Sequence, residues 1–122
     1  MYTERLLDHF QHPRNAGEIP DADVRVEVSN PICGDILRLT AKLSSGRVET
    51  IGYLTRGCTA SIAVGSALTE LLQGRTSTEA LAITKEQVEE AVGGLSNESK
   101  HAALLAVDGV KALAREMDAG AA

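Results

Sequence analysis

The sequence of 122 residues is poor in the residue types that many binding surfaces use. Aromatic residues make up 2% of it and tryptophan is absent, which argues against stacking platforms for bases or sugars. Lysine and arginine together number 12, against 17 aspartates and glutamates, and the formal net charge is -5. An acidic chain lacks the clustered cations that bind phosphate backbones. We therefore expect no nucleic acid among its partners.

Long apolar runs and abundant cysteines are missing as well. No run approaches the roughly 20 apolar residues that span a bilayer, so we expect no membrane segment. The chain has two cysteines and shows no signal-peptide pattern, which favours a reducing compartment where thiols stay free to bind metal or carry sulfur. A cytoplasmic location follows as an expectation.

The length fits a single domain. A chain of 12.9 kDa buries roughly two thirds of its unfolded surface and needs no disulfide to fold. With so few aromatic residues, the core must be built from leucine, isoleucine, valine and alanine. We expect residues 1–122 to form one domain, with a frayed tail over residues 118–122.

Apolar and polar residues alternate in three segments, which predicts three β-strands over residues 24–30, 37–43 and 48–55. The turn Ser44-Ser45-Gly46 joins the last two as a hairpin. The simplest arrangement is an antiparallel sheet.

Helical spacing of apolar residues and capping motifs predict helices in the rest of the chain. The expected helices span residues 2–11, 60–72, 77–82 and 85–92, and a last one follows the capping residues 96–99. Strands followed by helices indicate an α+β domain. We predict a three-stranded antiparallel sheet packed against several helices.

Both cysteines lie beside a glycine at the end of a predicted element. Cys33 belongs to Asn30-Pro31-Ile32-Cys33-Gly34-Asp35, where a thiol, a turn glycine and a carboxylate fall within three residues. Cys58 stands where a strand ends and a helix begins, and the free N–H groups of a first helical turn stabilise a thiolate. We interpret Gly57 as allowing a backbone geometry that a side chain would forbid.

Cys33, Asp35 and Cys58 together indicate a metal site, because thiolate and oxygen ligands suit zinc or iron. Each residue by itself has a simpler explanation, as a buried structural cysteine or a turn carboxylate. Among the histidines, His9 and His12 are interpreted as packing or surface residues. His101, in the first turn of the last predicted helix, remains open between a solvated side chain and a ligand.

These motifs resemble the iron–sulfur cluster scaffold family of IscU and NifU amino-terminal-domain proteins. The resemblance extends over about residues 2–117 and rests on three segments: residues 2–15, the loop of residues 30–35, and Gly57-Cys58-Thr59-Ala60-Ser61. It implies a scaffold without enzymatic turnover, which assembles a [2Fe-2S] cluster or holds Zn²⁺. A cysteine desulfurase would supply the sulfur, and apoproteins would accept the cluster.

The chain departs from this family at its third cysteine, whose position is occupied by Ala102. Alanine offers no ligand atom, so an all-cysteine cluster environment cannot be built within one chain. The resemblance then implies a mixed ligand set of Cys33, Asp35, Cys58 and His101.

Two alternatives follow from the missing thiol. The chain could be a degenerate homologue that binds the desulfurase as a regulator, or a persulfide acceptor that carries sulfur without a stable cluster. A homo-oligomer in which two incomplete sites share one cluster also remains open.

Overall fold

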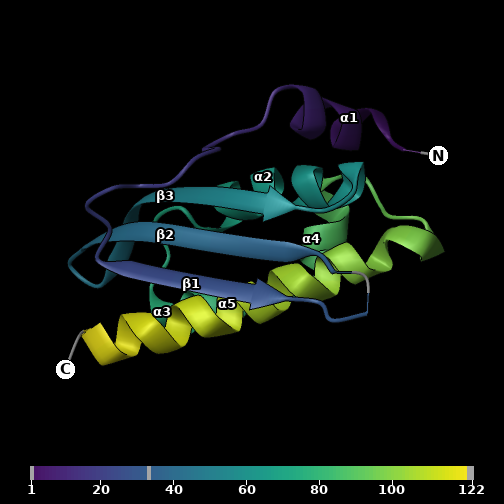
Figure 1. The fold of residues 1–122 in the computed structure, drawn as a ribbon. Coiled ribbons are helices and arrows are strands. Elements are labelled where there is room, and N and C mark those ends of the chain that lie inside the picture. Colours follow the sequence, from purple (N-terminus) through teal and green to yellow (C-terminus); the bar gives the residue numbers. More distant parts are fainter. Residues whose placement is uncertain (1, 33, 121–122) are drawn as a thin grey trace.

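The computed structural model describes residues 2–32 and 34–120, and within them one sheet is covered by helices (Figure 1). The predicted α+β class is confirmed, and each predicted strand is present with ends that differ by no more than one residue. In chain order the elements are α1 (Glu4–Gln11), β1 (Val24–Ser29), β2 (Ile36–Ser44), β3 (Arg47–Arg56), α2 (Thr59–Leu72), α3 (Ser77–Leu81), α4 (Lys85–Ala91), a 3-10 turn (Asn97–Ser99) and α5 (Lys100–Gly120).

The sheet has the order β1-β2-β3, and both pairings are antiparallel. Ser45 and Gly46 both have positive φ, 53° and 76°, as the tight turn of a twisted hairpin requires. At the end of the sheet opposite this turn, Ser29 lies across from Ile36, and Ile36 lies across from Arg56. The loop after β1 and the end of β3 therefore lie at the same end of the sheet.

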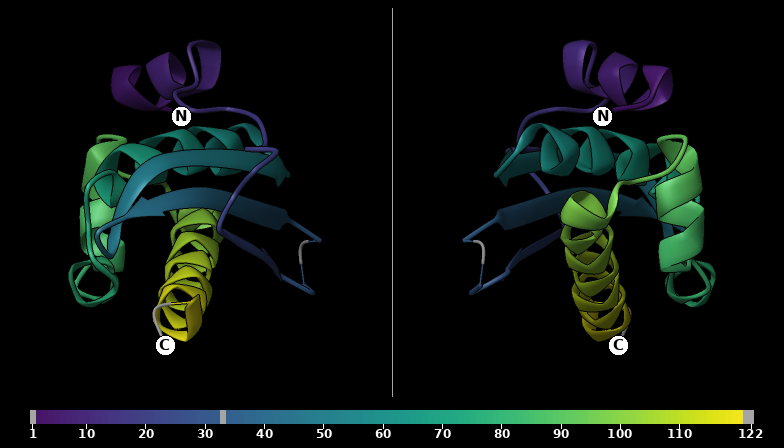
Figure 2. Two further views of the ribbon diagram at one scale, coloured as in Figure 1. Left: turned by 90° about the vertical axis from the view of Figure 1, so that its left-hand side faces the viewer. Right: turned by 90° about the vertical axis from the view of Figure 1, so that its right-hand side faces the viewer.

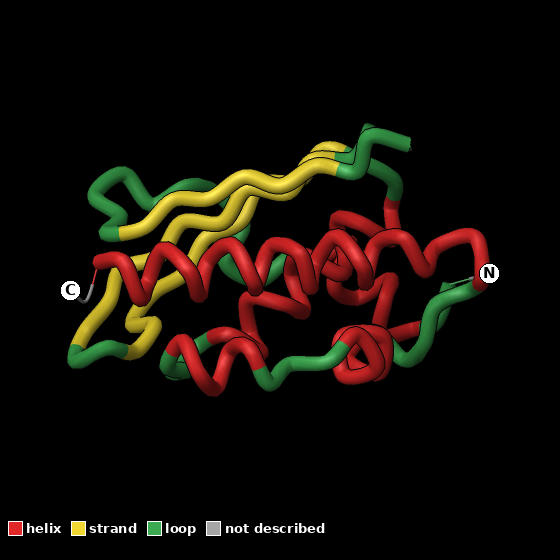
Figure 3. The backbone as a smooth tube through the Cα atoms, turned by 90° about the horizontal axis from the view of Figure 1, so that it is seen from below, coloured by secondary structure: helices red, strands yellow, loops and turns green. Residues whose placement is uncertain are grey.

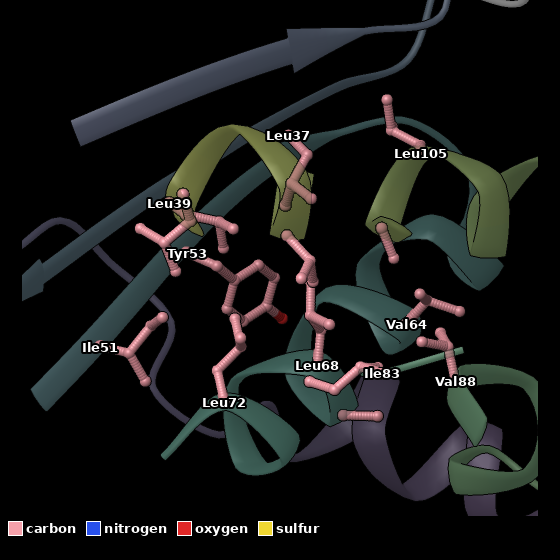
Figure 4. Packing of buried hydrophobic residues seen from close by; sticks show 14 of the residues in the cluster. Leu37, Leu39, Ile51, Tyr53, Val64, Leu68, Leu72, Ile83, Val88 and Leu105 are labelled. Atoms are coloured by element: carbon pink, nitrogen blue, oxygen red, sulfur yellow. The ribbon is translucent and has the colours of Figure 1, made fainter. Parts of the chain in front are cut away.

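Two helices cover one face of this sheet. α2 packs against β3, and α5 runs along β1 and β2 (Figures 2 and 3). No helix within the described residues is long and apolar enough to cross a bilayer. The core between the layers is aliphatic apart from Tyr53 (Figure 4), and its fully buried leucines and valines are Leu6, Leu39, Val48, Val64, Leu68, Leu72, Val88, Val92, Val110 and Leu113.

The helix ends match the capping predictions in two of three places. Thr76 and Thr84 each form a capping box, with Glu79 and Gln87 respectively. The cap predicted for the last helix is wrong, because a 3-10 turn intervenes and the Ser96 hydroxyl donates to the side chain of Ser99 instead of receiving a backbone N–H.

The last helix extends into the C-terminal tail. Residues 118–120 continue α5 as helix, next to the buried Met117, and the fraying expected of this tail stays a prediction. Residues 121 and 122 lie outside the described residues.

The first helix is held to α2 by a buried histidine. His9 is 8% exposed, and its Nδ1 lies 2.7 Å from the hydroxyl oxygen of Ser66, which also accepts the backbone N–H of Arg14 at 2.8 Å. The hydroxyl proton is therefore free for Nδ1, and Nε2 faces Glu70 at 3.6 Å. Burial, followed by the charge of Arg14, lowers the pKa of His9, while Glu70 and Asp8 oppose this shift.

This histidine makes the docking of α1 sensitive to pH. Because the pKa of His9 in the fold lies below its ordinary 6.5, the unfolded chain takes up a proton first as the pH falls. We expect the free energy of unfolding to be highest above pH 6.5 and to decline below it.

Urea unfolding between about pH 7.5 and 5.5, above the range of ordinary carboxyl groups, measures this decline. His9→Asn keeps an acceptor for Ser66 but does not titrate, so its stability should change less over the same range. Equal slopes for the two proteins would contradict this role of His9.

Candidate metal centre

The first component of the candidate site is the loop between β1 and β2. Its ends are joined by the Asn30 N–H, which donates to the carbonyl of Asp35 at 2.8 Å, and by the Gly34 N–H, which donates to the carbonyl of Asn30 at 2.7 Å. Gly34 has φ 76°, as expected for a turn glycine. The loop thus places the side chain of Asp35 at the end of the sheet, where this side chain is 8% exposed.

The second component is the junction of β3 and α2. Cys58 is the N-cap residue of α2, but its side chain makes no capping hydrogen bond. Its thiol is exposed, and Sγ lies 3.9 Å from Nε2 of His101. The sulfur is therefore available to a ligand at the surface.

Gly57 has a role that differs from our sequence interpretation. Its φ is not in the left-handed region, so its backbone is one that other residues adopt. A Cβ at this position would instead lie 2.8 Å from Cγ of Asp35 and 2.9 Å from both carboxylate oxygens. Glycine is required here because Asp35 packs directly against the backbone.

The third component is the start of α5. His101 is the second residue of this helix, and its Nε2 lies 3.3 Å from Oδ2 of Asp35. One ligand atom each of Asp35, Cys58 and His101 lies within 4.8 Å of the others. Three of the four predicted site residues therefore converge, while Cys33 lies outside the described residues.

The distances between the three donors can be compared with those around a tetrahedral metal ion. Bonds of about 2.0–2.3 Å from zinc to nitrogen, oxygen and sulfur put neighbouring ligand atoms about 3.3–3.6 Å apart. The Asp35 to His101 distance of 3.3 Å meets this value, the Cys58 to His101 distance of 3.9 Å is longer, and all three donor atoms lie within 4.8 Å of one another. Ala102 is 2% exposed and belongs to the core, and it adds no donor.

Ser61 is a residue of this site to which sequence reasoning gave no role. Its hydroxyl donates to Oδ2 of Asp35 at 2.5 Å and lies 3.5 Å from Sγ of Cys58. The spacing of three residues between Cys58 and Ser61 puts both on one side of the first turn of α2. That spacing was the available signal.

Comparison with known proteins identifies similar chains along nearly the whole sequence. The family model of the NifU-like N terminal domain matches residues 1–119. The iron-sulfur cluster assembly scaffold protein IscU 1 of Archaeoglobus fulgidus is 45% identical over 111 residues, which cover 91% of this chain and 72% of that protein. The protein of the same description, IscU, from Azotobacter vinelandii is 36% identical over 119 residues, covering 94% and 92%.

A solved structure agrees in fold. The N-terminal part of a nitrogen-fixing NifU-like protein from Brucella abortus aligns with a TM-score of 0.73, covering 96% of this chain and 94% of that one. The two sequences are 16% identical, so this similarity concerns the fold alone.

The contact between Asp35 and Gly57 can be tested by mutation. Gly57→Ala should reduce the free energy of unfolding by about 1–3 kcal/mol, the usual cost of overpacking, because the new methyl group meets the carboxylate. In an Asp35→Ala background the same substitution should cost little, since the obstacle is gone. Denaturant unfolding of the four proteins checks this, and an undiminished cost in the Asp35→Ala background would contradict it.

Proposed function

Because the chain belongs to the family of NifU-like N terminal domains, we propose that it is a scaffold on which an iron–sulfur cluster is assembled and from which the cluster is passed on. The family predicted from the cysteine motifs is confirmed. The observation that carries the proposal is the convergence of Asp35, Cys58 and His101 from three separate segments. Relatives at 45% and 36% identity bear the name of such scaffolds.

The proposed ligands of the cluster are Cys33, Asp35, Cys58 and His101. With two cysteines in the chain, an all-thiolate site is not available within it. Imidazole replaces thiolate on one iron of some [2Fe–2S] centres, and carboxylate oxygen is a harder donor than thiolate. A mixed set of this kind would hold the cluster less firmly than four thiolates, as suits a scaffold that must release it. The same four side chains would also accept zinc.

The chemistry assigns a different contribution to each described donor. Cys58 supplies a soft thiolate at the surface, which sulfur from a cysteine desulfurase can reach. As ligands, His101 would offer an imidazole nitrogen and Asp35 a carboxylate oxygen that is already buried beside the site. The acceptors of the cluster would be apoproteins, and the chain itself would turn over no substrate.

The regulator and persulfide-acceptor alternatives are less well supported. A protein that only bound the desulfurase would have no need for three donors within 4.8 Å of one another. The relatives are named as scaffolds, which favours cluster assembly.

Anaerobic reconstitution tests the scaffold proposal. Protein incubated with ferrous iron, cysteine, a desulfurase and a thiol reductant, which reduces the transferred sulfur to sulfide, should gain stoichiometric iron and sulfide and a visible charge-transfer absorption, and should then pass both to an apo-ferredoxin. Cys58→Ala and His101→Gln should lose most of the bound iron, because each removes a ligand. His12→Gln is the matched control, since His12 is exposed and lies outside the site. Native protein that gains neither iron nor sulfide would refute the proposal.

Ala102 offers a second test. Ala102→Cys adds a thiolate at the position that the family uses, so we expect the reconstituted cluster to be transferred to apo-ferredoxin more slowly. Because Ala102 is 2% exposed, the larger side chain should also cost about 1–3 kcal/mol of stability, which thermal unfolding of the apoprotein measures. An unchanged transfer rate and an unchanged visible spectrum would show that position 102 does not reach the cluster.

A further inference from the structure

The hydroxyl of Ser61 contacts two of the three described donors. It donates to Oδ2 of Asp35 at 2.5 Å and lies 3.5 Å from Sγ of Cys58. Ser61 is 4% exposed, so solvent water does not compete for this hydroxyl. One buried side chain therefore connects a donor of the β1–β2 loop with a donor at the start of α2.

The orientation of this hydroxyl is unusual for a serine inside a helix. Serine is a weaker helix former than alanine, and within a helix its hydroxyl commonly turns to solvent or to the carbonyl four residues earlier. Ser61, in the first turn of α2, instead donates to a residue 26 positions away in the sequence. The contact with Asp35 is thus a tertiary interaction and not a helix cap.

The carboxylate of Asp35 needs this donor. A buried carboxylate is costly unless hydrogen bonds replace the lost water. Among the described residues, Ser61 is the side chain that forms a hydrogen bond to it. The backbone of Gly57 occupies the neighbouring space, because a Cβ added to this residue would lie 2.9 Å from each carboxylate oxygen. Together these contacts fix the direction in which Asp35 presents its oxygens.

We propose that Ser61 is a positioning residue, which holds Asp35 in the direction that a bound metal requires and thereby sets how firmly the site retains it. The proposal rests on the scaffold function proposed above. Hydrogen-bond partners of ligating carboxylates typically change metal affinity about 10–100-fold when they are removed. We expect Ser61→Ala to weaken metal binding by a factor in this range.

Titration with Co²⁺ tests the proposal on the full chain under reducing conditions. Binding is followed by the thiolate-to-cobalt absorption, which reports cysteine thiolate as a ligand, and by the visible bands, which report the geometry around the ion. Ser61→Ala should raise the dissociation constant and shift the visible bands. In an Asp35→Ala background, Ser61→Ala should have no further effect, because Ser61 acts through Asp35.

Ser66→Ala is the matched control. Ser66 is a buried serine of the same helix, whose hydroxyl contacts His9 and Arg14 and not the site. Its loss should lower the melting temperature of the apoprotein while leaving the Co²⁺ dissociation constant unchanged. This separates a general loss of stability from a loss of positioning.

Two results would overturn the proposal. One is a Ser61→Ala protein that binds Co²⁺ as tightly as the native chain, and the other is an effect of equal size in the Asp35→Ala background. Either leaves the scaffold function standing, provided that the native protein binds Co²⁺ through thiolate and gains a cluster on reconstitution. If the native protein does neither, both proposals fail together.

Discussion

The arrangement of the site depends on the contacts of the buried Asp35 carboxylate. The Asp35 side chain is 8% exposed and lies between Gly57, the hydroxyl of Ser61 and the imidazole of His101. These groups come from the end of β3 and from the first turns of two helices. A buried charge is tolerated only where such partners surround it, so the position of Asp35 and the presence of each neighbour depend on one another.

The sheet and its helical layer bring these segments together. β1 and β3 both run toward the same end of the sheet, where Ser29 pairs with Ile36 and Ile36 pairs with Arg56. The buried faces of the strands fix this pairing register, because a shift of one residue would expose the core leucines of β2 to solvent. α5 packs along β1 and β2, and its first turn places His101 at the same end of the sheet. The aliphatic core thus positions the segments that carry the donors.

The ligand set connects stability with the proposed function. Its donors belong to three segments of the fold, so a metal or cluster bound by all of them would stabilise the folded chain by mass action. In the absence of cargo, the same groups hold one another through the contacts among Asp35, Ser61 and His101. The chain has two cysteines, and the buried methyl group of Ala102 adds no donor, so the proposed site would mix thiolate with harder donors. Such a mixture would favour release of what the site binds.

The sequence by itself determined the class of fold, the three strands and both capping boxes, and it made Cys33, Asp35 and Cys58 candidate donors. These features are encoded locally, in alternation, helical spacing and short motifs, whereas His101 became a candidate only through the resemblance to the family. Only the tertiary structure decided why residue 57 is glycine, that His9 is buried against Ser66, and that Ser61 holds Asp35. The physical reason is distance along the chain: the bond from Ser61 to Asp35 joins residues 26 positions apart and the contact of Cys58 with His101 joins residues 43 apart, whereas a periodic pattern reports only on near neighbours.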